Sequence, residues 1–362
     1  MEITIVSAFF YPEITPRSFR TTELVKELVN RGYDVKLYIP KRDFDYTEFR
    51  KKYPVDICYF SKEQTGGIKL PVGNSIIKKG IRYIYYQFCH YTEYPQIKYV
   101  NEVYNALKGT KHNVIISIAA PHSIHWGVAK AIKNDSTLCN RWIADCGDPF
   151  MGDQVTKRPF YFKSKEMLFC KHADYITVPI ERAIEAYYQQ FRKKIRVIPQ
   201  GFDFNKKNTV EVKNKVPTFA YAGIFYKGYR DLNSFVELLN RDYSDKMYKL
   251  VLYTKPSSLT DSYKSVLGEK LEIRDFIPRE ELLKVLSRMD FLLNIENAGT
   301  AQSPSKLIDY YLTSRPILSV SQKINKEIVS EFMNGEYKNA LVLENMERYD
   351  IKNVVNEFIK LF

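Results

Sequence analysis

The sequence lacks the features that mark a membrane-spanning, secreted or zinc-binding protein. No run of eighteen apolar residues occurs, so no transmembrane helix is expected. The first six residues read as a strand, without the basic start and apolar centre of a signal peptide. The cysteines are few, odd in number and spaced like no zinc or redox motif: Cys58, Cys89, Cys139, Cys146 and Cys170. We therefore expect a reduced, cytoplasmic protein without a bound metal.

Acidic residues are also scarce relative to basic ones. The 362 residues include 55 Lys and Arg but 42 Asp and Glu, which gives a formal charge of +13. This balance favours an anionic partner, namely a polyanion, an anionic membrane surface or an acidic substrate. No run of five basic residues forms a nucleic-acid tail, so we expect no nucleic acid as partner. A solvated basic surface without a partner remains the alternative.

Apolar runs alternate with amphipathic segments through most of the chain. Residues 3–7 read as a buried strand, 17–30 as a helix with one apolar face, and 35–39 as the next strand. A second series of the same kind starts at residues 218–223. Within the first series the pattern predicts a helix at 181–190. Alternating strands and helices predict an α/β protein with parallel sheets.

The length is too great for one ordinary core, and two domains are expected. Residues 205–216 are polar and charged, as in a linker between domains. We expect an N-terminal Rossmann-like domain at 1–203 that binds an acceptor. We expect a second Rossmann-like domain at 204–362 that binds a nucleotide sugar, with a final helix able to pack back on the first domain.

Three polar side chains in the first half follow the ends of predicted strands. His122 lies in the loop after strand 114–117, and Asp145 and Asp148 follow strand 141–144. The carboxyl ends of parallel strands meet at one edge of the sheet, where open α/β sheets bind ligands. We therefore take these three residues as candidates for catalysis. The alternative for any one of them is a cap or turn residue.

Cations occur in the first turns of two predicted helices, where they oppose the helix dipole. Arg17 and Arg20 lie in the first turn of the helix after the first strand. Lys306 follows a polar loop in which Ser303 or Ser305 can cap the next helix. A helix N-terminus with an added cation suits a phosphate group. An ordinary capped helix with a local contact between Lys306 and Asp309 is the alternative.

Residues 74–104 interrupt the alternation of strands and helices. The part at 74–91 is basic and aromatic, and no acid follows until Glu93. A helix of this composition can lie on an anionic membrane, with its apolar side chains inward and its cations at the headgroups. The alternative is an amphipathic helix packed on the sheet.

Taken together, these motifs resemble those of the family-4 glycosyltransferases, which have the GT-B fold, and the resemblance covers nearly the whole chain. The motifs that carry it are Ile5-Val6-Ser7, Phe10-Tyr11-Pro12-Glu13, Pro16-Arg17, Pro121-His122, Trp142-Ile143-Ala144-Asp145, Asp148-Pro149, Val197-Ile198-Pro199-Gln200-Gly201-Phe202-Asp203, Tyr221-Ala222-Gly223, and Ser303-Pro304-Ser305-Lys306-Leu307-Ile308-Asp309-Tyr310 through Pro316-Ile317-Leu318. The resemblance implies two Rossmann-like domains facing a cleft. It is not specific for the sugar.

The resemblance also implies roles for individual residues. Asp309 matches the second of two acids spaced eight apart, which binds the nucleotide ribose, while the position of the first acid holds Ala301. Glu296, five residues before Ala301, is our candidate for the missing acid. A basic pair after the first strand of the second domain clamps the diphosphate. The expected donor-binding residues are Lys227, Arg230, Ser303, Ser305, Lys306, Asp309 and Arg17, and the expected catalytic residues are Asp145, Asp148, His122 and Glu296.

These features predict a retaining glycosyltransferase that needs no metal or other cofactor. Its expected donor is a UDP- or GDP-linked sugar that supplies a hexosyl or N-acetylhexosaminyl group. Its expected acceptor is a lipid-linked saccharide of surface-polysaccharide synthesis, reached at the inner face of the plasma membrane. Two alternatives stay open: another GT-B enzyme, such as a nucleotide-sugar epimerase or an inverting transferase, and a non-catalytic basic module that binds nucleic acid or anionic lipid.

Overall fold

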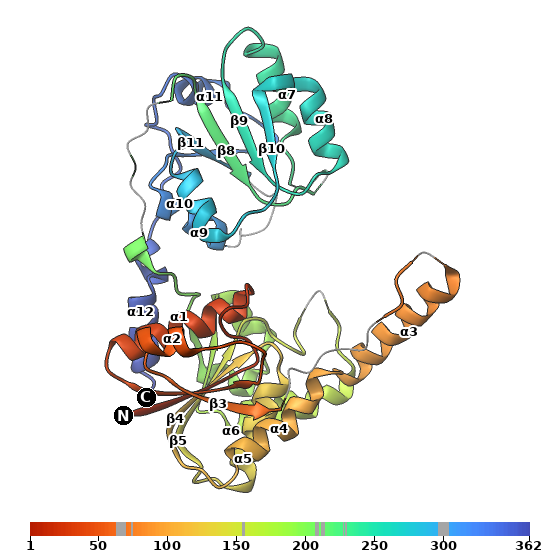
Figure 1. Cartoon of the computed structure of the whole chain (residues 1–362), viewed down its shortest axis with the longest axis vertical. Coiled ribbons are helices and arrows are strands. Elements are labelled where there is room, and N and C mark those ends of the chain that lie inside the picture. Colours follow the sequence, from red (N-terminus) through yellow and green to blue (C-terminus); the bar gives the residue numbers. More distant parts are fainter. Residues whose placement is uncertain are drawn as a thin grey trace. The chain divides into compact units, whose positions relative to one another are not determined.

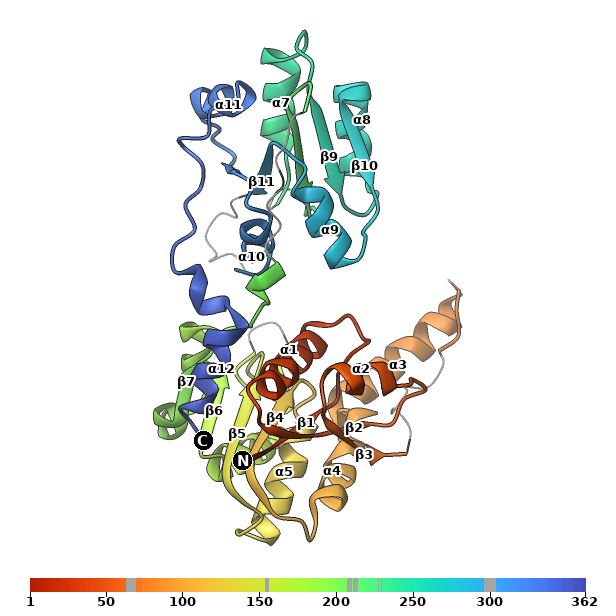
Figure 2. The ribbon, with the colours of Figure 1, turned by 60° about the vertical axis from the view of Figure 1, so that its left-hand side comes forward.

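The computed structural model describes residues 1–62, 70–73, 75–153, 156–206, 210, 214–226, 228, 230–295 and 304–362. The chain forms two compact units, each with its own sheet (Figures 1 and 2). Unit 1 comprises Met1–Asp203 and Arg348–Phe362, and unit 2 comprises Phe204–Glu347. The last helix of the chain therefore belongs to the same unit as the first strand.

Unit 1 contains a seven-stranded parallel sheet in the order β3-β2-β1-β4-β5-β6-β7. Its strands are β1 (Glu2–Ser7), β2 (Asp34–Pro40), β3 (Asp56–Ser61), β4 (His112–Ala119), β5 (Cys139–Cys146), β6 (Tyr175–Val178) and β7 (Ile195–Val197). Its helices are α1 (Pro16–Asn30), α2 (Thr47–Lys52), α3 (Ile76–Thr92), α4 (Tyr99–Leu107), α5 (Ser123–Asn134), α6 (Lys163–His172) and α12 (Ile351–Ile359). The predicted parallel α/β fold is confirmed here.

Both faces of this sheet are covered by apolar helix faces. On one face, Leu24 and Leu28 of α1 and Phe358 of α12 pack in a cluster with Ile3 and Ile5 of β1. A second cluster holds side chains of α4, α5 and α6 against the opposite face. Burial on both sides explains why the strands read as continuous apolar runs rather than as an alternating pattern.

Local sequence sets both ends of α1. The Thr15 hydroxyl accepts a hydrogen bond from the backbone N–H of Ser18 at 3.1 Å, and Pro16 occupies the first turn. Gly32 follows the helix with a φ of 80°, a conformation that glycine adopts without strain. The helix therefore begins directly behind the loop that follows β1.

The predicted helix at 181–190 is wrong. The segment instead forms two short 3₁₀ helices, Glu181–Ala186 and Gln189–Lys194. Between them Tyr187 is extended and almost fully buried. Burying this ring in the core interrupts the helix, so tertiary packing overrides local propensity at this point.

Unit 2 contains a five-stranded parallel sheet in the order β10-β9-β8-β11-β12. Its strands are β8 (Thr218–Ala222), β9 (Lys249–Tyr253), β10 (Leu271–Arg274), β11 (Phe291–Ile295) and β12 (Ile317–Val320). Its helices are α7 (Asn233–Asp242), α8 (Ser258–Leu267), α9 (Arg279–Leu286), α10 (Pro304–Thr313) and α11 (Lys326–Met333). Helices α7, α8 and α11 share one apolar cluster, and α9 and α10 share another.

The two sheets repeat one topology. In each, the first strand lies beside the fourth as well as the second, so the strand order reverses between β1 and β4 and between β8 and β11. In open parallel sheets such a reversal leaves a crevice at the carboxyl ends of the two strands, where ligands bind. The loops after β1, β4, β8 and β11 are therefore the places to look for function.

Helix α3 differs from every other α-helix described in unit 1 because none of its residues is buried. Its outer end projects beyond the rest of the unit (Figure 1). The alternative of an amphipathic helix packed on the sheet is therefore contradicted. Among the described residues, no helix combines the length and apolar composition that a membrane span requires.

Candidate functional site

Asp145 lies at the end of β5 and is bound on several sides. The guanidinium of Arg20 donates to its two carboxylate oxygens at 3.0 and 2.8 Å, and the Thr177 hydroxyl donates to Oδ1 at 2.6 Å. Burial pushes the pKa of Asp145 upward, but the charge and hydrogen bonds of Arg20 outweigh it and hold the pKa below its ordinary value. Asp145 is thus an ionised carboxylate that holds the side chains of Arg20 and Thr177 in position.

Arg20 is itself a bridging residue of unit 1. Its guanidinium also donates to the carbonyl oxygens of Ile198 and Pro199, which follow β7, and it lies over the ring of Phe358. Its side chain is almost fully buried. The structure therefore assigns Arg20 to the frame of the sheet, although its position at a helix start also suits an anionic ligand.

Arg17 is the second arginine near Asp145, but its contacts are weaker. Its guanidinium lies 4.0 Å from a carboxylate oxygen of Asp145 and 3.5 Å from the carbonyl oxygen of Ala119. Burial lowers the pKa of Arg17, and neighbouring Arg20 lowers it further, whereas Asp145 and Asp148 raise it. One buried carboxylate thus serves two arginines, and Arg17 holds positive charge at the sheet edge with about one fifth of its side chain exposed.

Gly147 makes room for this guanidinium. A Cβ atom at position 147 would lie 2.5 Å from Cζ of Arg17 and 2.6 Å from one of its terminal nitrogens. The absence of a side chain at 147 therefore lets α1 supply a guanidinium directly above the loop that follows β5. Asp148 is the exposed carboxylate of this loop.

His122 and His125 lie below the same loop, in the core of unit 1. Burial lowers the pKa of His122 well below its ordinary value, and His125 adds to this effect. Among the described residues the Nε2 atom of His122 has no hydrogen-bond partner. Burial also lowers the pKa of His125, to about 3. Both imidazoles are therefore neutral at physiological pH.

A chain of buried hydrogen bonds positions His125. Its Nδ1 atom lies 2.7 Å from the hydroxyl oxygen of Ser117, which accepts a bond from the Trp142 indole at 2.8 Å, and its Nε2 lies 3.3 Å from the Cys146 sulfur. This network joins β4, α5 and β5 just below the loop that holds Asp148. Sequence patterns gave no signal for it, because its members lie up to 29 residues apart.

In unit 2, Lys306 lies in the first turn of α10 with its ammonium group on an aromatic face. Its Nζ atom is 3.4 Å from the ring centroid of Tyr221 at the end of β8 and 5.3 Å from that of Tyr310. Burial lowers the pKa of Lys306 well below its ordinary value, and the charge of Arg230 lowers it further. Within the described part of the chain, no carboxylate lies within ion-pair distance of this ammonium group.

Arg230 enters the same site from the loop after β8. Its backbone pairs with Tyr226 in both directions, at 2.8 and 2.7 Å, and its guanidinium lies over the Tyr226 ring. Its charge acts on both Lys306 and Tyr221. Two cations predicted from separate parts of the sequence are thus brought together at the end of β8, next to the N-terminus of α10.

Asp309 lies one turn further along α10 and contacts Arg279 of α9. Nε and a terminal nitrogen of Arg279 both approach Oδ1, at 2.8 and 2.6 Å. Burial raises the pKa of Asp309, while the charge of Arg279 opposes the rise. Sequence reasoning missed Arg279, which is thirty residues away and belongs to no motif that we identified.

Four further predicted residues cannot be placed in this site. Lys227, Glu296 and Ser303 lie outside the described residues, and Ser305 belongs to α10 although its side chain is not described. In the described parts of both units, no group of three or more His, Cys, Asp or Glu side chains is arranged to hold a metal ion.

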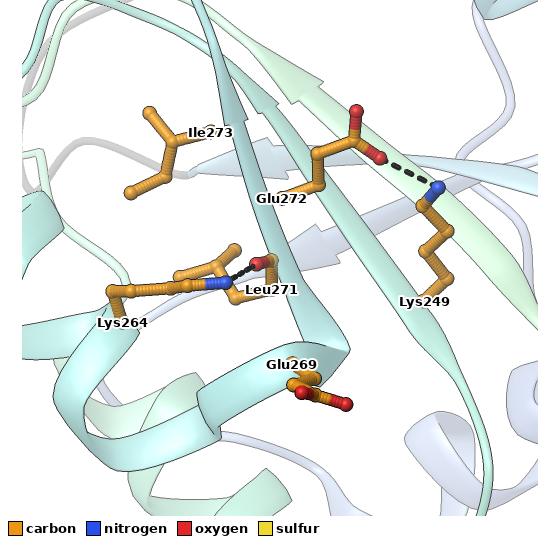
Figure 3. A pocket seen from close by; sticks show the side chains of 6 residues that line it. All are labelled: Lys249, Lys264, Glu269, Leu271, Glu272 and Ile273. Atoms are coloured by element: carbon orange, nitrogen blue, oxygen red, sulfur yellow. Dashed lines mark hydrogen bonds and ion pairs between the residues drawn. The ribbon is translucent and has the colours of Figure 1, made fainter.

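A surface hollow of roughly 480 Å³ lies elsewhere on unit 2, where β9 and β10 begin (Figure 3). Lys249 pairs with Glu272 there, and the Lys264 ammonium group donates to the carbonyl oxygen of Leu271. These charged groups already have partners, and they lie at the opposite end of the strands from Lys306. The hollow is therefore not part of the candidate site.

Solved structures with a similar fold cover nearly the whole chain. They include the apo lipopolysaccharide outer core galactosyltransferase WaaB, at 12% identity and a TM-score of 0.55, covering 100% of this chain and 99% of that one. Anabaena HepE in complex with UDP and glucose has 9% identity and a TM-score of 0.56, with 99% and 98% covered. UDP-GlcNAc 2-epimerase from Neisseria meningitidis, bound to UDP-GlcNAc, has 10% identity and a TM-score of 0.58, with 100% and 99% covered.

The likeness at these low identities defines the fold alone. The chain consists of two Rossmann-like units with parallel sheets of seven and five strands, as in proteins of the GT-B fold. No protein-family model and no curated protein matches the sequence.

Breaking the buried ion pair of unit 1 should strongly destabilise the protein. In Arg20→Met, Asp145 is left as a buried charge without its main partner, and we expect a loss of about 3–5 kcal/mol in the free energy of unfolding at neutral pH. The loss should shrink in acid, because a protonated Asp145 needs no cation. Urea unfolding at neutral and acidic pH measures both effects.

The double variant Arg20→Met, Asp145→Asn is the matched control. It removes both charges, so it should be more stable than the single variant at neutral pH. A single variant as stable as the wild type would show that the pair does not hold the frame of unit 1.

Proposed function

We propose that the protein is a retaining glycosyltransferase of the family-4 type. It transfers a hexosyl or N-acetylhexosaminyl group from a nucleotide-diphosphate sugar to a lipid-linked saccharide. The observation that carries this proposal is the pair of cations, Lys306 and Arg230, at the end of β8 and the N-terminus of α10. The two positive charges repel each other, and burial removes part of the hydration of Lys306. A bound anion would offset both costs, so the pair fits an anion-binding site.

The chemistry of glycosyl transfer requires such a site. As the bond between the anomeric carbon and the diphosphate breaks, negative charge grows on the departing phosphate. Cations and helix N–H groups aimed at this position stabilise the transition state more than the ground state. Lys306, Arg230 and the backbone N–H groups in the first turn of α10 are assigned this role, which calls for no cofactor.

The similar solved structures support uridine over guanosine in the donor. HepE was solved with UDP and with UDP-glucose, and the Neisseria epimerase with UDP-GlcNAc. Asp309 is assigned to the ribose hydroxyls, because the two close approaches of Arg279 both go to Oδ1 and neither uses Oδ2. Arg279 then holds the carboxylate in position from the side.

Unit 1 is assigned the acceptor. Arg17 adds positive charge above Gly147, and Asp148 is exposed next to it. We infer that Arg17 contacts phosphate and that Asp148 orients an acceptor hydroxyl, with His122 as a neutral neighbour beneath. A saccharide on a lipid diphosphate suits this charge pattern, and surface-polysaccharide synthesis at the inner membrane face is the corresponding process.

An epimerase acting on a nucleotide sugar is the second candidate. The Neisseria epimerase matches this chain with a TM-score no lower than those of the transferases. An epimerase needs no acceptor, so incubation with the donor alone followed by separation of the sugars distinguishes the two functions. The proposed transferase leaves the configuration of unreacted donor unchanged.

Donor binding should appear as thermal stabilisation that depends on Lys306. A ligand at about 100 times its dissociation constant stabilises by about 2.7 kcal/mol. We expect UDP or GDP and one of its sugars to raise the Tm of the wild type. Lys306→Met should lose this response and yet be more stable without ligand, on the order of 1 kcal/mol, because it removes a partly buried ammonium group that has no ionic partner among the described residues. Differential scanning fluorimetry with a panel of nucleotide diphosphates measures both.

Lys338→Met is the matched control, since Lys338 is an exposed lysine of the same unit. It should respond to nucleotides as the wild type does. If the wild type gains no stability from any nucleotide diphosphate or nucleotide sugar, the proposed function is wrong.

Nucleotide affinity should fall as pH rises through the lowered pKa of Lys306. An anion binds the protonated ammonium group, so binding raises the pKa of Lys306 and takes up a proton. We expect this loss of affinity at a pH where an ordinary lysine would remain fully charged. Calorimetry above about pH 7.5, where phosphate is essentially ionised, in buffers of different ionisation enthalpy detects the proton.

Lys306→Arg should abolish that proton uptake, because a guanidinium remains charged throughout the range. Proton uptake that is equal in this variant and in the wild type would assign the titration to another group.

If Asp309 binds the ribose, a change at Asp309 and the removal of a ribose hydroxyl should cause losses of nucleotide-binding free energy that are not additive. Asp309→Asn keeps the shape of the side chain but weakens hydrogen bonds from the ribose hydroxyls, each worth about 1.5–3 kcal/mol to a charged acceptor. The variant should bind a ribonucleotide diphosphate about as weakly as the wild type binds the deoxyribose analogue that lacks the bonded hydroxyl. Titration calorimetry over the four combinations gives the coupling energy, and additive losses would refute a direct contact.

A further inference from the structure

Helix α3 presents an apolar stripe that the other described residues of unit 1 leave largely exposed. Ile77, Ile81, Ile84, Phe88 and Tyr91 recur at spacings of four and three residues, so they share one side of the helix. Each of the five is at least 46% exposed, and Ile77 is 74% exposed. An isolated exposed residue needs no explanation, but a continuous stripe along four turns marks an interaction surface.

The stripe continues beyond the C-terminal end of the helix. The hydroxyl of Tyr161 donates to the carbonyl oxygen of Tyr91, and Arg158 pairs with Glu93, which follows α3. These contacts hold segment 158–161 next to the last turn. Within it, Phe160 is 85% exposed. We call this surface, formed by the stripe with Phe160 and Tyr161, the α3 face.

Cations flank the α3 face and acids are absent from it. Lys78 and Arg82 donate to the carbonyl oxygens of Pro71, Val72 and Gly73, which anchors the preceding segment, and within the described residues neither cation has an ion-pair partner. Lys79 is exposed, and the sequence from 70 to 92 contains no acidic residue. Exposed Lys157, Lys163 and Lys165 extend the positive charge around Phe160.

We propose that the α3 face docks on an anionic membrane surface. Isoleucine and phenylalanine side chains enter the boundary between headgroups and acyl chains, and the cations contact lipid phosphates. Tyr91, an exposed member of the stripe, combines an apolar ring with a hydroxyl and suits the same boundary. The proposal deepens the proposed function by naming the partner of unit 1, where the lipid-linked acceptor would arrive.

Charge complementarity favours a membrane over a second copy of the chain. Two copies meeting through the α3 face would bring unneutralised cations together without an opposing carboxylate, which is unfavourable. An anionic bilayer supplies the opposite charge and an apolar layer in one partner. The length of α3 also suits a helix that lies in the boundary rather than one that spans the bilayer.

The test is co-sedimentation of the full chain with vesicles of phosphatidylglycerol and phosphatidylcholine, and with phosphatidylcholine alone, at two salt concentrations. We expect the wild type to pellet with anionic vesicles and to do so less at high salt. Ile77→Gln, Ile81→Gln, Ile84→Gln together should lower the partition coefficient on the order of 100-fold, because glutamine keeps the helix but removes the apolar side chains.

A second variant tests the charges. Lys78→Gln, Lys79→Gln, Arg82→Gln together remove three charges, yet glutamine still donates hydrogen bonds to the carbonyls of the preceding segment. Its partition onto anionic vesicles should fall on the order of 100-fold at low salt, and its residual binding should depend little on salt.

Both variants have matched controls in unit 2. Met247→Gln, Val266→Gln, Val342→Gln changes three exposed apolar side chains, and Lys246→Gln, Lys255→Gln, Lys323→Gln removes three exposed charges. Both controls should pellet as the wild type does. All four variants should keep the wild-type Tm, which shows that a lost response does not come from unfolding.

Three outcomes would overturn the docking proposal. They are a wild type that does not pellet, an isoleucine variant that pellets equally, and a dimer in analytical ultracentrifugation that the isoleucine variant abolishes. The assay contains neither donor nor acceptor. A protein that binds vesicles but no nucleotide diphosphate would therefore contradict the proposed transferase but support the docking proposal. A protein that binds a nucleotide diphosphate but no vesicles would support the transferase and contradict the docking proposal.

Discussion

The buried ion pair between Arg20 and Asp145 is the interaction on which the frame of unit 1 depends. It joins the first helix to the end of β5, and further bonds reach Thr177 of β6 and the carbonyls of Ile198 and Pro199 after β7. The ring of Phe358 from the last helix covers the guanidinium. One buried ion pair thus joins segments that lie 178 residues apart in the sequence, and Asp148 lies three residues beyond Asp145 in the loop that follows β5.

The same carboxylate sets the charge of the candidate site. Because Arg20 makes both close contacts with Asp145, Arg17 at 4.0 Å is only partly neutralised. In unit 2, Lys306 rests on the Tyr221 ring beside Arg230 and has no ion pair within the described residues. Each unit therefore places a cation at the carboxyl ends of its central strands, where the dipole of the following helix adds to the positive potential. Buried charge of this kind lowers stability, and an anionic ligand reverses the effect.

Sequence reasoning found the architecture because the relevant signals are local. Apolar runs, caps and glycines repeat at each strand–helix junction, so the parallel α/β fold and the cations at helix starts were both predictable. The ion-pair partners of the charged residues were not predictable from the sequence. Asp309 binds an arginine thirty residues away, and Arg20 binds a carboxylate 125 residues away. Charge and position identified Arg17 and Arg20 equally, but only packing shows that Arg20 belongs to the frame whereas Arg17 faces the site edge. The helix predicted at 181–190 failed for a similar reason, because burial of Tyr187 decides the backbone there.

Helix α3 shows how an unburied element can belong to a folded protein. A helix of this length is marginal in water unless tertiary contacts support it. Within the described residues the support that α3 receives is limited: Lys78 and Arg82 bind the preceding segment, and Tyr85 and Phe88 contact Tyr94. The isoleucine side of the helix, with Ile77, Ile81 and Ile84, remains exposed. This apolar area lowers the solubility of the protein and does not stabilise the unit while it faces water. The free energy of burying it is gained only when a membrane or another molecule covers it. An anionic bilayer covers both the apolar stripe and the cations beside it, and docking there would also complete the support that α3 lacks.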